Sequence, residues 1–518
     1  MKTLDLHLRE QSPVMLRAIA QSQGLVIDAA GQRAFRQALV EQMLDRAHIA
    51  EVWQDLEAPA HQALQALRHE ENRIPVTAFQ RRFGEIRRFG PGYLQKEKPW
   101  KHPANVAEQL WYLGLLARGF VETADGLAEF FSIPGDLLPL LPLPNSASER
   151  FAFPPAISEP LQPPGGGQDH SNDQGLDDHL PEVDSRKAGE RFLDDLATVL
   201  IHLQQRRVWV DSRGDWRKKD LQLLAPKLKT PPPDPDHPLA PGGRLALIFH
   251  CARALGLVQT VERRQRLHGE TVRPWLEQSR QQQVATLFAA WRDSAAWNDL
   301  CLTPGLHCER GNWRNDPGAT RLALLDILGQ AQTGQWLGLD AFIAAIHEQR
   351  PDFQRPDGNY DTWYIRDDDG SYLKGFEHWD DVEGRLLRYL WSGPLHWLGV
   401  IALDGEGQHW RLTPAGLAML HPDASSPPAA VSPPPLVVTA DFHITLPPNH
   451  RLYDRLRVAR FCVWEASLPD YRYRITQRGL RRAAAAGISP EQVLAFLTAA
   501  SGEHIPDNVR SALTKFTP

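Results

Sequence analysis

The stretch ALGLVQTVERRQRLHGE, residues 254–270, decides the fold. An apolar helical run ends in Leu-Gly-Leu around Gly256, and two short extended runs separated by a polar turn follow it. Glycine suits the C′ position after a helix, because a positive φ costs least where there is no Cβ. The same order recurs around Gly114 and Gly399. The sequence therefore predicts three helix–hairpin units with a left-handed glycine at each helix end.

Helical segments with apolar residues at three- and four-residue spacing precede each hairpin. Three helices followed by a two-stranded hairpin is the order of a winged helix-turn-helix. We therefore expect a mainly α protein with small β-hairpins, an α+β fold built from tandem winged-helix modules. The third module carries an acidic insertion over about residues 350–376. The alternative is that the three units are ordinary helix–hairpin pieces of an α+β domain.

The length of 518 residues predicts several domains, and three Pro-rich segments separate them. The predicted organisation is an N-terminal helical segment (1–58), winged helix 1 (59–142), a flexible Pro/Gly linker (143–186), winged helix 2 (187–276), a helical connector (277–316), winged helix 3 with its acidic insertion (317–421), a Pro-rich linker (422–435) and a small C-terminal α/β domain (436–518).

The composition is ordinary for a globular protein, with a net charge of −6 and four cysteines. No run approaches about 20 apolar residues, and the first residues lack the apolar core of a signal peptide. We expect a cytoplasmic location, with association with the nucleoid as a variant, and no membrane partner. Four scattered cysteines do not make a disulfide framework, so Cys301 and Cys308 beside His307 are expected to be buried or loop thiols.

The sequence lacks the motifs of a nucleotide-driven motor. No G-x-x-x-x-G-K-[ST] phosphate loop is present, and none of the lysines follows a glycine. HExxH, GxSxG and paired CxxC motifs are also missing. We therefore expect a protein that is not an enzyme, with no catalytic residues and no cofactor.

One acidic stretch has partial calcium-loop spacing. Asp357, Asn359, Asp361 and Asp368 fall at loop positions 1, 3, 5 and 12, but Thr362 stands at position 6, where a glycine must make the turn. Solvated acids on a hairpin are the favoured interpretation, so no metal ligands are assigned.

Positive side chains gather where winged helices contact nucleic acid. Over residues 79–101 they interleave with aromatic rings, and elsewhere they open the second helix of module two and occupy its hairpin tip. Three arginines near a C-terminal helix start oppose the helix dipole, which favours a polyanion or an acidic partner there. A solvated charged face is the alternative for any one cluster. The candidate DNA-binding residues are Arg81, Arg82, Arg87, Arg88, Lys96, Lys98, Lys101, Arg217, Lys218, Lys219, Arg263, Arg264, Arg266, Arg478, Arg481 and Arg482.

The C-terminal segment carries a resemblance to a known family. VVTADFHITLP, YRITQRGLRRAAAAGISPEQVLAFL and IPDNVRSAL resemble the XPB/Ssl-type helicase N-terminal domain found in bacterial helicase-associated proteins, and WYLGLLARGF and FFSIPGDLLPLLP look like N-terminal parts of such proteins. In that family the small domain accompanies the helicase motor and contributes to DNA engagement or subunit docking. Because the motor motifs are absent, the chain looks like a non-catalytic accessory subunit, similar to the TFIIH subunit that clamps XPB.

We therefore expect a non-enzymatic DNA-binding protein that binds duplex DNA with low sequence specificity. The resemblance implies an accessory role to an XPB-type helicase, or to another subunit, in DNA repair or transcription. One alternative is an interaction scaffold that docks on a helicase or repair complex without touching DNA. A second alternative is a winged-helix transcription regulator.

Overall fold

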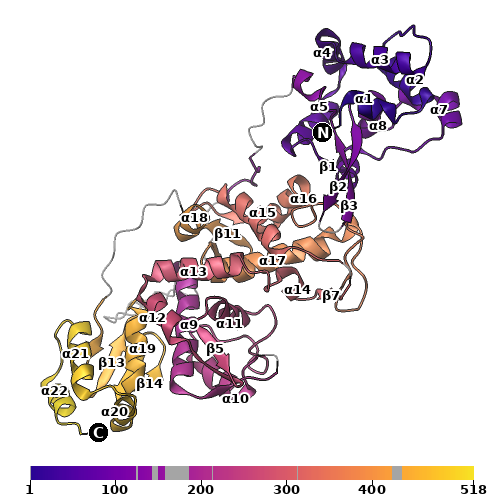
Figure 1. Ribbon diagram of the computed structural model, residues 1–518. Coiled ribbons are helices and arrows are strands. Elements are labelled where there is room, and N and C mark those ends of the chain that lie inside the picture. Colours follow the sequence, from indigo (N-terminus) through magenta and orange to yellow (C-terminus); the bar gives the residue numbers. More distant parts are fainter. Residues whose placement is uncertain are drawn as a thin grey trace, which may run out of the picture.

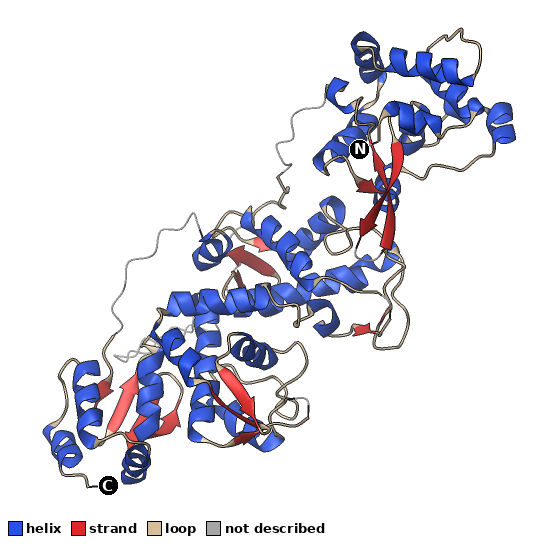
Figure 2. Cartoon of the chain, in the orientation of Figure 1, coloured by secondary structure: helices blue, strands red, loops and turns tan. Residues whose placement is uncertain are grey.

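The computed structural model of the protein describes residues 2–123, 126–142, 150–157, 186–212, 214–311, 313–422 and 434–517. Within them the fold is α+β, with many short helices and small antiparallel sheets (Figures 1 and 2). The N-terminal and C-terminal units lie at opposite ends of the molecule (Figure 1). No helix in the described part of the chain is long and apolar enough to cross a membrane.

The N-terminal unit contains four helices followed by the first of three repeats, which runs from α5 to β3. Its elements are α1 (Leu4–Arg9), α2 (Pro13–Ser22), α3 (Gln32–Met43), α4 (Arg46–Asp55), α5 (Ala58–His69), β1 (Ile74–Pro75), α6 (Val76–Phe83), α7 (Pro91–Glu97), η1 (Pro99–Lys101), α8 (Val106–Tyr112), β2 (Ala117–Thr123), β3 (Gly126–Ser132) and η2 (Leu138–Leu140).

The second repeat runs from α9 to β6 and is followed by a helix that packs toward the C-terminal unit. Its elements are α9 (Arg186–Gln205), β4 (Val208–Trp209), α10 (Lys218–Leu224), η3 (Ala225–Lys227), α11 (Arg244–Ala254), β5 (Val258–Val261), β6 (Arg264–Leu267) and α12 (Gly269–Glu277).

The third repeat runs from α15 to β11 and follows a connecting segment. The elements of both are α13 (Arg280–Arg292), α14 (Asp299–Leu302), β7 (His307–Cys308), α15 (Pro317–Gly329), β8 (Leu337–Gly338), α16 (Leu339–Gln349), β9 (Ile365–Arg366), η4 (Phe376–His378), η5 (Asp380–Gly384), α17 (Arg385–Leu390), η6 (Trp391–Leu395), β10 (Ile401–Leu403), β11 (His409–Leu412) and α18 (Pro414–Leu420).

The C-terminal unit is a small sheet covered by helices. Its strands are ordered β12-β13-β15-β14, and every pair is antiparallel. Its elements are β12 (Val437–Val438), β13 (His443–Leu446), α19 (Leu452–Phe461), β14 (Cys462–Ala466), β15 (Tyr471–Ile475), α20 (Gln477–Ala485), α21 (Pro490–Ala500) and α22 (Asp507–Thr514).

The three repeats share one sheet order. A short strand before the second helix pairs with the second hairpin strand, which gives β1-β3-β2, β4-β6-β5 and β8-β11-β10. The predicted glycines at the helix ends are confirmed, with φ of 68° at Gly114, 64° at Gly256 and 76° at Gly399. At each site the N–H of the residue after the glycine donates to the carbonyl of the residue five positions before it, as in a Schellman motif.

The apolar core is divided in two. One cluster belongs to the N-terminal unit, and the other extends through the second and third repeats into the C-terminal unit. The second and third repeats meet backbone to backbone, since a Cβ on Gly189 would lie 2.9 Å from the carbonyl oxygen of Leu398. Arg455 of α19 is buried against α9, where it donates to the carbonyl of Asp194 and the hydroxyl of Thr198. The C-terminal unit is therefore fastened to the second repeat by both apolar and polar contacts.

Part of the predicted linker is packed against the third repeat. Phe151 is buried, and its ring lies 5.7 Å from that of Phe342. The flexible-linker prediction is therefore wrong for residues 150–157, because two phenylalanines supply apolar area that a free linker would leave in water. Residues 143–149, 158–185 and 423–433 of the two predicted linkers lie outside the described residues.

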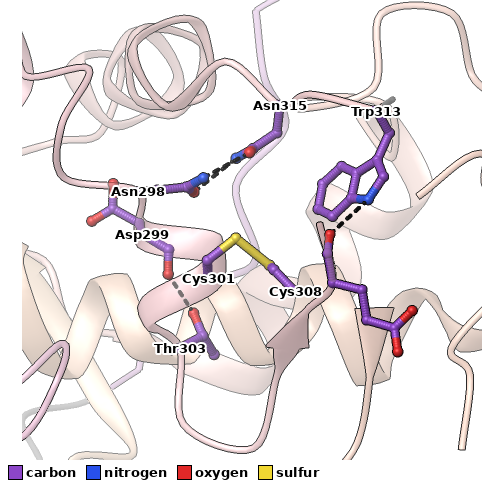
Figure 3. The surroundings of a disulfide bond; sticks show 8 residues. Asn298, Asp299, Cys301, Thr303, Cys308, Trp313 and Asn315 are labelled. Atoms are coloured by element: carbon purple, nitrogen blue, oxygen red, sulfur yellow. Dashed lines mark hydrogen bonds between the residues drawn. A yellow bond between two sulfur atoms is a disulfide. The ribbon is translucent and has the colours of Figure 1, made fainter. Parts of the chain in front are cut away.

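The expectation that Cys301 and Cys308 are thiols is wrong, because the two form a disulfide (Figure 3). The chain turns back at Gly305, with φ of 78°, and brings the two Cα atoms to 5.4 Å. Strand β7, which contains Cys308, pairs with β9 of the acidic insertion. The disulfide thus anchors the strand on which the insertion is built.

Candidate nucleic-acid interface

Arg81 of the first repeat lies at an internal interface instead of a free surface. Its guanidinium pairs with Asp352 and lies 4.3 Å from the centre of the Phe376 ring. It also donates to the carbonyl of Gly358. Asp352, Gly358 and Phe376 all belong to the acidic insertion of the third repeat. The positive charge of Arg81 therefore joins two parts of the chain and is not available to a phosphate.

Arg87 is also engaged within the chain. It donates through Nε and Nη2 to the two carboxylate oxygens of Glu108, at 2.6 and 2.7 Å. Burial raises the pKa of the Glu108 carboxyl, but the hydrogen bonds from Arg87 and from the N–H of Ala104 outweigh it and hold that pKa below its usual value. The basic segment is fastened to α8 by this pair.

Other cations of the same segment remain at the surface. Arg82 is exposed and lies over the ring of Phe83, and Lys96 lies 3.6 Å from Glu97. Arg88, Lys98 and Lys101 are exposed, and none of them forms an ion pair with a described residue. The first repeat therefore keeps only part of its predicted positive surface.

The hairpin of the second repeat presents its cations to solvent. A two-residue turn at Glu262 and Arg263 joins β5 to β6, with φ of 50° and 61° at the two positions. Arg263 and Arg266 are exposed and form no ion pair in the described part of the chain, whereas Arg264 is half-buried with a buried Nε. The predicted tip is therefore positive, and two of its three arginines are accessible.

The start of α10 adds further positive charge to the second repeat. Arg217 is the residue before the helix, and both it and Lys219 are exposed without an ion pair to any described residue. Lys218 lies 3.1 Å from Asp236, and both partners are largely exposed. Such a surface pair is weak and opens readily.

Helix α20 follows its N-cap residue Thr476, whose hydroxyl accepts the N–H of Gly479. Arg478 and Arg481 are exposed and unpaired with described acids. Arg482 instead donates to the carbonyls of Ala459, Arg460 and Cys462, where α19 ends. It therefore has a structural role besides its charge.

A cleft lies between the second repeat and the C-terminal unit. Its volume is about 480 Å³, and four of its lining residues are arginines. Arg273 comes from α12, Arg457 and Arg460 come from α19, and Arg482 comes from α20. No acidic residue stands among the described residues that line it. The wall is completed by Gln204, Gln205, Leu267, Gly269, Val272, Leu276, Tyr453, Leu456, Ala459, Ala483, Ala486 and Ile488.

Acids near the cleft reduce its positive charge only in part. Arg273 pairs with Glu277 at 3.0 Å across an exposed helix surface, and Arg457 lies 3.8 Å from Asp454. Arg273, Arg457 and Arg460 were not predicted from the sequence. The spacing of three residues between Arg457 and Arg460 places both on one face of α19, and this was the available signal.

The acidic insertion offers little that resembles a calcium site. Asp357 Oδ1 accepts the N–H of Asn359, and Asp368 Oδ1 lies 2.9 Å from Nε2 of His307. No group of three His, Cys, Asp or Glu side chains in the described ranges is placed to hold a metal ion. Arg355, which is buried, donates to Glu383 at 2.7 Å and fastens the base of the insertion.

The arrangement provides surfaces that can hold anions at several points of the second repeat and the C-terminal unit. Arginine suits such sites, because its planar guanidinium can donate two parallel hydrogen bonds to a phosphate. No protein-family model matches the chain, and no curated protein matches its sequence.

Proposed function

We propose that the protein is a non-enzymatic DNA-binding protein whose three repeats are winged-helix modules. Duplex phosphates would be held by the hairpin of the second repeat and by the arginine-lined cleft beside it. The observation that carries this proposal is the cleft, where four arginines from two units meet without an acidic residue among the described lining. Neutralising phosphates releases condensed counterions, which drives binding that does not depend on sequence.

Low sequence specificity is supported by how the helix that precedes the hairpin is packed in the first and second repeats. In a winged helix this is the helix that reads base edges in the major groove. In α11 of the second repeat, six of eleven residues are buried, and they lie on more than one face of the helix. In α8 of the first repeat, four of seven residues are buried. Little side-chain surface is left for base contacts, so phosphate contacts dominate.

The C-terminal unit also supports the proposed accessory role to an XPB-type helicase. Its strand β14 lies at one end of the sheet, and its outer edge pairs with no strand in the described residues. Val463 of β14 is 43% exposed, and Leu468 just after it is 64% exposed. An open, partly apolar edge can accept a strand from a partner protein. A docking role without DNA contact remains the competing proposal.

A salt titration tests the proposal. The full-length protein is titrated with a fluorescent 20-base-pair duplex from 50 to 300 mM salt, and log K is plotted against log salt. The Arg273→Gln/Arg460→Gln variant should show a slope reduced by about 2, since each neutralised phosphate contributes about 0.9. The control is Arg9→Gln/Arg388→Gln, which removes the same charge from exposed pairs with Asp5 and Asp340.

Either of two results would contradict the proposal. One is the absence of binding at 50 mM salt, which would favour the docking role. The other is binding whose salt slope is the same in the wild type, the cleft variant and the control. Recovery of a complex between the purified protein and a purified XPB-type helicase, lost on Val463→Lys, would support the accessory role.

A further inference from the structure

A second cavity lies in the first repeat, far along the chain from the arginine-lined cleft. Its volume is about 200 Å³, and its wall combines aromatic rings with guanidinium groups. Drug-sized ligands occupy pockets of about 300 Å³ or more, so a cavity of this size suits a single ring system. The lining residues are Met15, Ile86, Arg87, Arg88, Phe89, Leu94, Trp111, Tyr112, Arg118 and Phe131.

Two rings of this cavity pack against other aromatic rings. Phe89 stacks on Tyr93 with ring centres 4.5 Å apart, and Trp111 meets Phe131 edge to face. Phe89 and Trp111 are half-buried, and the Arg87 guanidinium lies 5.1 Å from the centre of the Phe89 ring. A flat, partly exposed aromatic surface is what a nucleobase stacks on.

Unused hydrogen-bond donors lie beside the rings. The Nε atom of Arg118 is buried and has no hydrogen-bond partner. The Nη2 atom of the same guanidinium lies 3.5 Å from a carboxylate oxygen of Glu129, which is a long ion pair. Arg88 is exposed and pairs with no described acid. Burial raises the pKa of Tyr112 to about 12, so its hydroxyl stays neutral. These groups can donate to the acceptors of a base edge and to a neighbouring phosphate.

We propose that this cavity binds one unpaired nucleobase, with the adjoining phosphate held by Arg88. The inference rests on the proposed DNA binding and extends it to a substrate class. A base inside a duplex is stacked and paired on its edge, so it can enter only from a single-stranded segment or after leaving the stack. The protein therefore prefers DNA in which a duplex adjoins unpaired nucleotides.

The test compares three DNAs that share one 20-base-pair duplex. The first is blunt, the second carries three unpaired thymidines, and the third carries three abasic units with the same phosphates. The wild-type protein should bind the thymidine DNA about five- to a hundredfold more tightly than the other two, as expected for stacking of one base. The abasic arm separates contact with the base from contact with phosphate.

Two variants address the cavity itself. Phe89→Leu and Arg118→Met should each lose most of the preference for unpaired thymidine and keep the wild-type affinity for the blunt duplex. The matched control is Phe120→Leu, because Phe120 lies on the same hairpin as Arg118 but is 59% exposed and outside the cavity.

The outcomes separate this inference from the proposed function. Equal, salt-dependent binding of all three DNAs would overturn the base site and leave duplex binding intact. An equal gain from thymidine and abasic extensions would also overturn it, because the contact would then be to phosphate alone. Absence of binding to all three DNAs would overturn both proposals.

Discussion

The first and second repeats share one sheet order and both contain clusters of basic residues, but the cations of the two repeats have different environments. In the first repeat, Arg81 pairs with Asp352 of another repeat and Arg87 pairs with the buried Glu108. In the second repeat, Arg263 and Arg266 lie exposed on a hairpin with no acid paired to them among the described residues. The same residue type thus holds the protein together in one repeat and remains accessible in the other.

The availability of a cation to a polyanion therefore depends more on its position in the fold than on the number of cations in the repeat. Arg81 lies in the last turn of α6, and this helix contacts the acidic insertion from its first turn, where the hydroxyl of Thr77 donates to the carbonyl of Asp357. An acidic partner is therefore within reach of Arg81. At the hairpin tip of the second repeat, the carbonyl of Arg263 accepts the N–H of Val210, while the side chain of Arg263 stays exposed. Charge density in a sequence therefore overestimates the surface available to a polyanion wherever the charges lie between units.

The largest expected effect is that of Glu108→Ala in the first repeat. This change removes the acceptor for Arg87 and for the N–H groups of Arg87 and Ala104. Leaving such donors unsatisfied should cost about 3 kcal/mol. Amide hydrogen exchange over residues 84–112 of the full-length protein measures the loss. Because Arg87 is also released, the salt slope for DNA should rise, which would make the first repeat behave more like the second.

The control for this variant is Glu85→Ala, since Glu85 is exposed in the same segment. Its effect should stay within about 0.5 kcal/mol. Equal exchange rates in the two variants would show that the Arg87–Glu108 pair does not hold the segment.

The next largest effect is a difference in salt slope between two double variants, each of which removes two positive charges. Arg263→Gln/Arg266→Gln should reduce the salt slope of duplex binding by about 2. Arg81→Gln/Arg87→Gln should leave that slope unchanged, because both guanidiniums already have acidic partners. Fluorescence anisotropy at four salt concentrations gives both slopes. Equal reductions in the two variants would remove the difference between the repeats.

A smaller effect is expected from pH. The pKa of Glu108 is held below the value of 4.5 that an ordinary glutamate has. A carboxylate with a lowered pKa adds stability that is fully present above its unfolded pKa and is lost as pH falls through the folded pKa. Hydrogen exchange corrected for intrinsic rates should therefore show the first repeat opening more readily as pH falls below about 4.5, an effect that Glu108→Gln abolishes.

The smallest effect concerns the hairpin tip of the second repeat. Glu262 and Arg263 both have positive φ, a combination that favours Asn-Gly in a two-residue turn. Glu262→Asn/Arg263→Gly should stabilise the hairpin by about 1 kcal/mol and reduce the salt slope by about 1. Local hydrogen exchange and DNA titration measure the two quantities on one sample. A gain in stability with an unchanged slope would show that Arg263 does not contact DNA.

Local features of the fold could be predicted from the sequence, and long-range contacts could not. The positive φ of the glycines at 114, 256 and 399 depends on a few neighbouring residues, and all three glycines have it. The pairing of Arg81 with Asp352 joins residues 271 positions apart, so no local sequence pattern predicts it.

The candidate site likewise contains residues that could be predicted from the sequence and residues that could not. The exposed cations Arg263 and Arg266 of the second hairpin were predicted, because connecting segments run over the protein surface. The cleft was missed because it forms only where α12 of the second repeat meets α19 and α20 of the C-terminal unit. The disulfide was missed for a similar reason, since its two cysteines are brought together by a turn at Gly305 and the pairing of β7 with β9.

The contact between Gly189 and Gly399 has a mechanical consequence. A Cβ on Gly399 would lie 3.1 Å from the backbone nitrogen of Gly189, and one on Gly189 would lie 2.9 Å from the carbonyl oxygen of Leu398. With no side chains between them to yield, the two main chains act as a stiff joint. A force on the second repeat would be transmitted directly to the third repeat. Alanine at either glycine would push the two main chains apart and weaken this contact.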